Sequence, residues 1–233
     1  MTMQTEQLAP NGLFVKICGI TSEEDALLAI AMGADAIGFV FAAGSTRQVA
    51  PARVADIVKR LPPDIATIGV FRNEVSERVI DIVRSTGLTG AQLHGHESIT
   101  ETASVARELA LVIKAFAAGD VAVERAREYP VDVVLVDNPK PGSGEIFDWS
   151  LAEGVPAGKR LILAGGLTPA NVGDAIAQVR PWGVDVSTGV ESAPGNKDAR
   201  KVRAFITNAR RAHAALPAFE GQADGPYDWQ EEF

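Results

Sequence analysis

The sequence contains a single cysteine, few aromatic residues and no long apolar run. Cys18 is the only cysteine among the 233 residues, so the chain cannot form an internal disulfide, which favours a reducing compartment. No apolar stretch approaches the roughly 20 residues of a membrane span, and residues 1–10 have neither the basic start nor the apolar middle of a signal peptide. We therefore expect a cytoplasmic protein that does not associate with a membrane.

Positive charge is also scarce. The chain has 22 Lys and Arg against 30 Asp and Glu, a net charge of −8, and no basic cluster large enough to follow a nucleic-acid backbone. We expect no nucleic-acid partner, and an anionic ligand would have to be held by local donors. With 46% hydrophobic residues, the composition is that of a globular protein with a substantial core.

The first apolar segment, residues 14–18, contains that cysteine. Val15 and Ile17 alternate with Lys16 and Cys18, which predicts a short strand that places Lys16 and Cys18 on one buried face. A lone cysteine in a strand is often a small core residue. Cys18, however, is the last strand residue before a glycine turn and a helix cap, the position at which α/β barrels carry their chemistry.

A unit of strand, glycine-containing turn and amphipathic helix repeats about eight times from residue 14 onward. The expected strands are 14–18, 36–41, 66–71, 91–94, 111–116, 131–137, 160–164 and 184–187, and the expected helices are 22–32, 51–61, 74–85, 98–109, 121–129, 149–153, 168–179 and 198–215.

Near-continuous apolar strands at this spacing predict an all-parallel sheet, and eight units predict a single α/β domain, a (β/α)₈ or TIM barrel. An open doubly wound sheet is the alternative, but no Gly-x-Gly-x-x-Gly follows the first strand. We expect a disordered leader over residues 1–12, the barrel over 13–215 and a tail without a barrel role over 216–233.

In such a barrel the polar residues at the carboxyl ends of the strands share one mouth. The candidates are Cys18, Gln92, His94, Asp137, Asp185 and Ser187, with Arg47 in the loop after the second strand. Asp137 ends an apolar strand, so its carboxyl group must be hydrogen-bonded, paired or functional. It would serve either as an acid, kept protonated by partial burial, or as a cap for the loop that follows.

Strands one and eight are neighbours in a closed barrel. Lys16 and Asp185 both face inward by alternation, so we expect them to pair, with Lys16 also favouring the thiolate form of Cys18. The ends of strands seven and eight supply Gly165-Gly166 and Ser187-Thr188-Gly189. Their free N–H groups predict a phosphate site, while residues 142–144 are expected to form a flexible cover.

Several motifs occur in a fixed order along residues 14–211. They are Lys16-Ile17-Cys18-Gly19-Ile20-Thr21, Gly38-Phe39-Val40-Phe41, Ser45-Thr46-Arg47, Gly69-Val70-Phe71, Gln92-Leu93-His94-Gly95, Phe147-Asp148-Trp149 within 144–149, Gly165-Gly166-Leu167, and the segment 183–191. Together they closely resemble the phosphoribosylanthranilate isomerase family. The resemblance implies a barrel of the ribulose-phosphate-binding type and an aldose–ketose isomerase of tryptophan biosynthesis.

The reaction implied is the Amadori rearrangement of N-(5-phosphoribosyl)anthranilate to 1-(2-carboxyphenylamino)-1-deoxyribulose 5-phosphate. By resemblance, Asp137 is the acid that opens the furanose ring and Cys18 is the base that removes the C2 proton. The protonated imine is the electron sink, so no metal or organic cofactor is expected. Arg47 would bind the anthranilate carboxylate and His94 would support by hydrogen bonding. Gly166, Ser187, Thr188 and Gly189 match the phosphate-binding segments, and Asp185 is counted with the substrate-facing residues.

Other functions are weighed on the same residues. The related aminoaldose isomerase of histidine biosynthesis has an aspartate where this chain has Cys18. A metal-dependent epimerase would need histidines at several strand ends, and only His94 is at one. Thiol nucleophilic catalysis would need a histidine partner, and His96 and His213 fall in a loop and the last helix.

A catalytically silent phosphate-binding barrel would be expected to lack Cys18 or Asp137, and both are present. The expected partner is therefore a small phosphorylated substrate, and the sequence leaves open whether the protein is a monomer or a homodimer.

Overall fold

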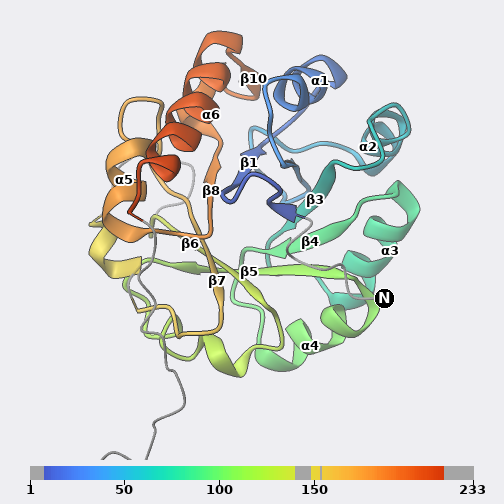
Figure 1. Ribbon diagram of the computed structural model, residues 1–233. Helices are drawn as coiled ribbons and strands as arrows, with labels where there is room; N and C mark the ends of the chain where they lie inside the picture. Colours follow the sequence, from blue (N-terminus) through green and yellow to red (C-terminus); the bar gives the residue numbers. More distant parts are fainter. Residues whose placement is uncertain (1–7, 140–147, 153, 218–233) are drawn as a thin grey trace, which may run out of the picture.

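Eight parallel strands close into a barrel, as predicted. The computed structural model describes residues 8–139, 148–152 and 154–217. The strands pair in the order β1 to β8, with β8 returning to β1, and the helices lie outside this ring (Figure 1). The strands are β1 Phe14–Cys18, β2 Ala36–Val40, β3 Ala66–Phe71, β4 Gly90–Leu93, β5 Leu111–Ala117, β6 Val133–Asp137, β7 Arg160–Leu163 and β8 Gly183–Val186.

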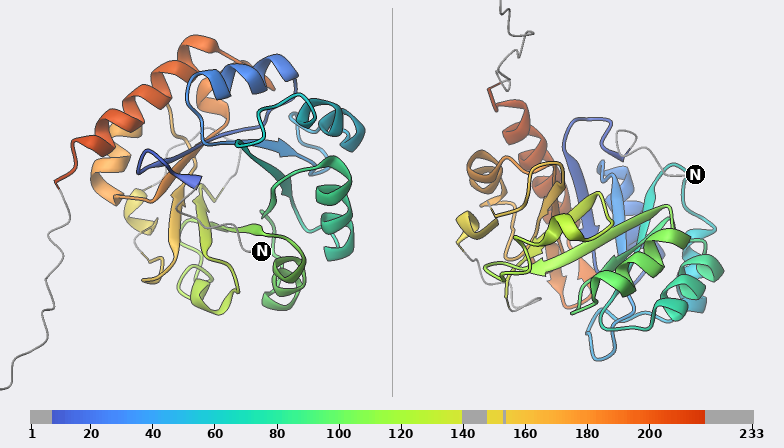
Figure 2. Two further views of the ribbon diagram at one scale, coloured as in Figure 1. Left: turned by 45° about the vertical axis from the view of Figure 1, so that its right-hand side comes forward. Right: turned by 90° about the horizontal axis from the view of Figure 1, so that it is seen from below.

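The helical layer follows the chain around the barrel, and Figure 2 shows it from two further sides. Its α-helices are α1 Glu23–Ala31, α2 Pro51–Val58, α3 Ser76–Thr86, α4 Ile99–Glu108, α5 Val172–Val179 and α6 Ala199–Ala214. Ser22 caps α1, and Ser98 with Glu101 forms a capping box on α4, as serine does at a helix start. In the described part of the chain, 3₁₀ turns replace α-helices after β5 and β6: η2 Ala126–Glu128 and η3 Trp149–Ala152.

The alternation of side chains along each strand builds two cores. Inward-facing residues such as Phe14, Ile68 and Leu135 fill the barrel, while outward-facing residues such as Val15 and Val134 pack under the helices. Both layers exclude water, and burial of this apolar surface is the main force that holds the barrel together.

Residues 8–12, which the sequence assigns to a disordered leader, are among the described residues, and Leu8 and Ala9 pack against the interior core while 10–12 are exposed. Leu8 is only 5% exposed and joins the interior core with Phe14, whose ring stacks on Trp182. An apolar side chain at this position gains from burial under the amino-terminal ends of the strands. The remainder of the expected leader, the loop 142–144 and the tail beyond residue 217 lie outside the described residues.

Two local predictions were wrong, and one element was missed. The helix expected over 121–129 is a series of turns with only η2 in it, and Asp120 accepts from the N–H of Ala122 at the first of these turns. Thr168 does not cap α5, which begins later with Asn171 at its N-cap. The segment after β8 forms a 3₁₀ turn, η4 Thr188–Val190, and a hairpin of β9 Glu191–Ala193 and β10 Asn196–Lys197, which the sequence analysis missed.

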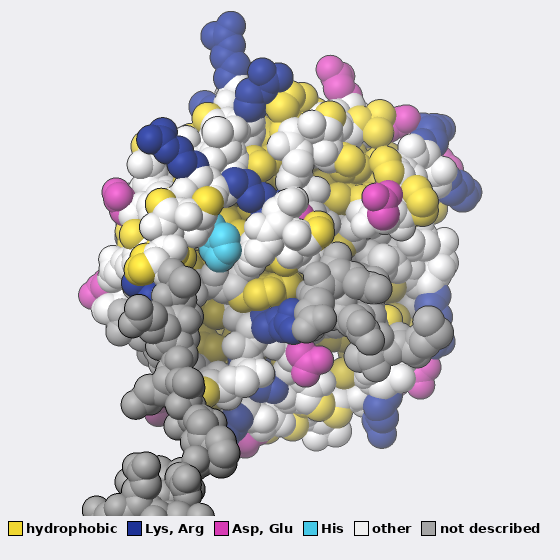
Figure 3. Space-filling model, viewed as in Figure 1, with side chains coloured by type: hydrophobic (Ala, Val, Ile, Leu, Met, Phe, Trp, Pro, Cys, Tyr) yellow, Lys and Arg dark blue, Asp and Glu magenta, His cyan; other side chains and the backbone are white. Residues whose placement is uncertain are grey.

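The outer surface is charged with both signs. In the face shown in Figure 3, acidic and basic side chains are interspersed around the rim, with several basic ones over α6. Among the described residues, no helix is both long and apolar enough to cross a membrane.

Candidate active site

Strands β1 and β8 place a charged pair beneath the thiol. Lys16 and Asp185 are paired in register, and Lys16 Nζ donates to Asp185 Oδ1 at 3.0 Å inside the barrel, which confirms the predicted pair. Gly38 on β2 lies opposite Cys18. A Cβ at Gly38 would be 2.8 Å from Cys18 Sγ and 3.0 Å from Lys16 Nζ, so only glycine leaves room for both groups.

The thiol is harder to ionise than the sequence suggested. Burial raises the pKa of Cys18, and although Lys16 opposes this, the net direction is upward because Asp185 adds to the effect of burial. Burial lowers the pKa of Lys16, but the charges of Asp185 and Cys18 outweigh it and the net shift is upward. The expectation that Lys16 favours thiolate is correct in sign, but burial and Asp185 outweigh Lys16 in the net direction of the Cys18 pKa.

Asp137 is held at the end of β6 by two donors. Its Oδ1 accepts from the N–H of Asn138 at 2.7 Å, and its Oδ2 lies 3.2 Å from His94 Nε2. His94 Nδ1 lies 2.8 Å from the Nε2 of Gln92, which as an amide nitrogen can only donate. With the amide in this orientation, His94 Nδ1 accepts from Gln92 and Nε2–H can donate a hydrogen bond to Asp137 Oδ2.

A cavity of about 150 Å³ lies at the ends of β6, β7 and β8. Its lining includes six of the predicted site residues: Asp137, Gly166, Asp185, Ser187, Thr188 and Gly189. Within the described chain, neither Gly166 nor Gly189 donates its backbone N–H to another residue. A Cβ at Gly189 would collide with the carbonyl oxygen of Leu167, so the two loops approach as closely as backbones can. These free donors in a small polar hollow suit a phosphate group.

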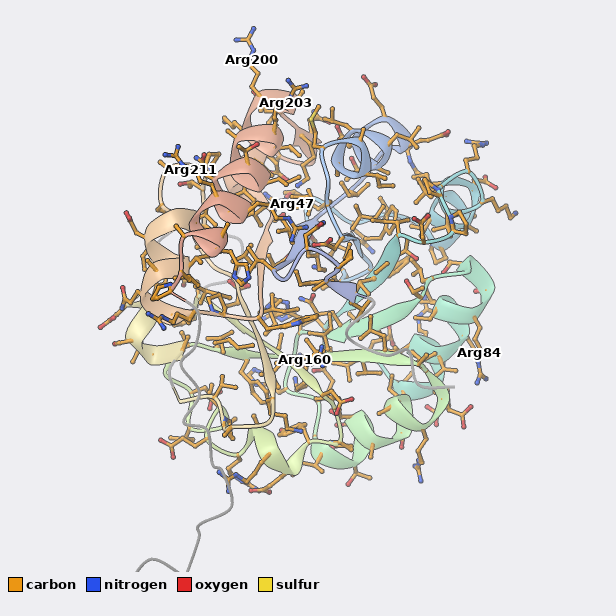
Figure 4. The ribbon with its side chains drawn as sticks, viewed as in Figure 1. Arg47, Arg84, Arg160, Arg200, Arg203 and Arg211 are labelled. Carbon is orange, nitrogen blue, oxygen red and sulfur yellow. The ribbon has the colours of Figure 1, made fainter. Side chains whose placement is uncertain are left out.

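Arg47 comes from the loop after β2 and lies toward the ring of strands in projection, whereas Arg84 and Arg200 lie at the outer rim (Figure 4). Its aliphatic part packs on Gly19, the residue after Cys18, where an added Cβ would also meet Ser187. The guanidinium is already engaged, because Nε and Nη2 donate to Oε1 and Oε2 of Glu191, each at 2.7 Å. The predicted residues therefore lie around one mouth, with the thiol and Arg47 on the β1 side of the cavity.

The sequence analysis missed several residues that shape this mouth. Asn171 accepts from the N–H of Thr168 and donates to the carbonyl of Gly166, which fixes the loop after β7. Asn138 is buried and lines the cavity. Glu191 lies inside the segment that was singled out, but only the fold reveals its pairing with Arg47, 144 positions away in the chain. Among the described residues, no group of three or more His, Cys, Asp or Glu could hold a metal ion.

The fold and this mouth define a class: a (β/α)₈-barrel enzyme with a carboxyl group, a thiol and a small polar hollow at the carboxyl ends of its strands. The sequence model of N-(5'-phosphoribosyl)anthranilate (PRA) isomerase matches residues 15–208. A relative of that name from Desulforudis audaxviator is 50% identical over 205 residues, covering 85% of this chain and 98% of the relative.

Solved structures of the same isomerase are similar to this chain in sequence and in fold. The phosphoribosyl anthranilate isomerase of Thermus thermophilus is 43% identical, with a TM-score of 0.80, and covers 87% of this chain and 100% of its own. A second isomerase structure, in complex with reduced 1-(o-carboxyphenylamino)-1-deoxyribulose 5-phosphate, is 42% identical with a TM-score of 0.76, covering 85% and 99%. The chain belongs to the N-(5'-phosphoribosyl)anthranilate isomerase family, and its activity is that isomerisation in tryptophan biosynthesis.

Proposed function

We propose that Asp137 and Cys18 are the acid and base of this isomerisation. Asp137 in its acid form donates a proton to the furanose ring oxygen, the bond from that oxygen to C1 breaks, and a protonated Schiff base forms. The thiolate of Cys18 then removes the proton from C2, and the electron pair moves into the imine to give an enolamine. Tautomerisation to the ketone completes the rearrangement without net gain or loss of atoms.

The observation that carries this assignment is that Asp137 shares one cavity with Gly166, Ser187, Thr188 and Gly189. A phosphate held by the loops after β7 and β8 would bring a sugar ring toward the end of β6. His94 supports the acid, because its Nε2–H can stabilise the carboxylate that remains after proton transfer.

The remaining site assignments follow from the same arrangement. We propose that Arg47 binds the anthranilate carboxylate, since a guanidinium makes directed pairs with carboxylates. Asp185 holds Lys16 charged, and Lys16 in turn stabilises the thiolate of Cys18 once it forms. The ligand is thus a small phosphorylated molecule with a second anionic group, bound at one mouth.

The extent and setting of the enzyme are also proposals. Regular elements of the barrel run from β1 through α6, which supports residues 13–215 as the catalytic unit. The single buried thiol at the site supports work in the reducing cytoplasm, where it would stay unoxidised.

The test is the loss of anthranilate fluorescence when the purified protein meets freshly generated phosphoribosylanthranilate. We expect Cys18→Ser and Asp137→Asn each to lower kcat by about 10²- to 10⁴-fold, the usual contribution of a positioned acid or base. Asp174→Asn, an exposed carboxylate on α5, is the matched control and should keep wild-type turnover. Full activity in either site variant, with the fold intact by circular dichroism, would assign the proton transfers to other groups.

A further inference from the structure

The buried carboxylate of Glu191 pairs with Arg47, the arginine proposed to bind the substrate. Glu191 begins the β9–β10 hairpin, and its side chain is only 4% exposed. It holds Arg47 in a forked pair that uses the Nε–Nη2 side of the guanidinium, with both distances 2.7 Å. A forked pair fixes the plane of the guanidinium as well as its position.

The fork leaves one end of Arg47 available. Among the described residues, Nη1 makes only a long contact of 3.5 Å with the Thr46 hydroxyl, and Nη2 makes a further contact of 3.4 Å with the Thr188 hydroxyl. These contacts are weak by distance, so the N–H groups at the Nη1–Nη2 end can still donate to a carboxylate end-on. Thr188 lines the phosphate cavity, which places this open end beside the proposed substrate.

Lys197 offsets the charge of Glu191. Its Nζ lies 3.0 Å from Oε1 of Glu191, and its side chain is fully buried. Burial raises the pKa of Glu191, but the bonds from Arg47 and Lys197 outweigh it and the net shift is downward, so the carboxylate stays ionised. Burial lowers the pKa of Lys197 even though the charge of Glu191 opposes this. The formal charges of Arg47, Lys197 and Glu191 sum to +1, so Arg47 can still attract an incoming carboxylate.

We propose that Glu191 is a positioning residue for Arg47: it holds the Nε side of the guanidinium so that the other end meets the arylamine carboxylate of the substrate, and Lys197 compensates its charge. The inference rests on the proposed role of Arg47 and extends it to the hairpin. The hairpin register supports this, since Lys197 pairs with Glu191 across β9 and β10. The β9–β10 hairpin therefore holds Arg47, the carboxylate-binding residue of the mouth, in place through Glu191.

The experiment uses the full chain and two competitive inhibitors, anthranilate and inorganic phosphate, which probe the two ends of the site separately. We expect Glu191→Gln to weaken inhibition by anthranilate by at least about tenfold, equivalent to about 1.4 kcal/mol, and to change inhibition by phosphate by less than about twofold. KM should rise more than kcat falls. Glu191→Asp, which keeps the charge, should recover part of the loss.

Glu108→Gln is the matched control, because it also removes a carboxylate paired with an arginine, Arg84, but at an exposed site on the outer rim. It should leave both inhibition constants unchanged. Equal weakening of anthranilate and phosphate inhibition in Glu191→Gln would show that Glu191 only supports the nearby loops, and no change or tighter anthranilate inhibition would also overturn the inference.

Arg47→Met separates this inference from the role on which it rests. If Arg47→Met leaves anthranilate inhibition unchanged, Arg47 does not bind the carboxylate and the proposed role fails. If Arg47→Met abolishes anthranilate inhibition while Glu191→Gln does not affect it, Arg47 keeps its role and the positioning role of Glu191 is wrong.

Discussion

Cys18 illustrates how far a residue's chemistry depends on neighbours that are distant in the chain. Its alternation with Lys16 predicts a shared face, and the structure confirms that Lys16 pairs with Asp185 there. The direction of the Cys18 pKa could not be read from that pattern. It depends on how completely eight strands exclude water from the thiol and on the negative charge of Asp185, and both push the pKa upward.

The opposing effects of these two neighbours on the Cys18 pKa are separable by mutation. Lys16→Met removes the charge that favours thiolate and should raise the Cys18 pKa further. Asp185→Asn removes the charge that opposes it and should lower the pKa below that of the wild type. Ultraviolet absorbance of the thiolate, titrated with pH, measures this directly. Cys18→Ser is the blank, because the chain has no other cysteine. Shifts in the same direction for both variants would contradict this account.

At the scale of elements, the strands were predicted well because apolar runs between glycine turns are a local signal. All eight strands were placed to within two residues, and β3 matches the predicted 66–71. Two of the failures are at segments held by particular side-chain hydrogen bonds, one of them local and one between residues far apart in the chain. The start of α5 depends on Asn171 reaching back to Gly166, and the β9–β10 hairpin is fixed by Glu191 pairing with Arg47. Neither bond leaves a periodic pattern in the sequence.

Substitution of Asn171 is expected to weaken phosphate binding at the site. Because its side chain bonds both Thr168 and Gly166, Asn171→Ala should loosen the loop after β7 and weaken inhibition by inorganic phosphate severalfold. Loss of these hydrogen bonds should lower stability by about 1 kcal/mol. Asn171→Asp keeps the acceptor for the Thr168 N–H, so its inhibition by phosphate should lie between that of the wild type and that of Asn171→Ala. Unchanged phosphate inhibition in Asn171→Ala, measured in the same fluorescence assay, would separate this loop from phosphate binding.

At the scale of the molecule, buried ion pairs link the stability of the barrel to pH. Lys114 and Glu97 form such a pair at 2.8 Å, with side chains 2% and 3% exposed, and Glu97 also accepts from the N–H groups of Asn73 and Gly95. Burial raises the pKa of Glu97, but Lys114 and these bonds outweigh it, so its folded pKa is lower than the unfolded value. The stability it provides is present above the unfolded pKa and is lost as pH falls through the folded pKa.

We therefore expect the free energy of unfolding to decrease in acid, and to do so less steeply in Glu97→Gln. That variant should already be about 3 to 5 kcal/mol less stable at neutral pH, because Lys114 is left buried without its carboxylate. The double variant Glu97→Gln with Lys114→Met removes the stranded charge and should recover much of that loss. Urea unfolding of the three proteins across pH measures both effects. A single variant as stable as the wild type at neutral pH would mean that water reaches Lys114 and that this side of the barrel is less tightly closed than its packing indicates.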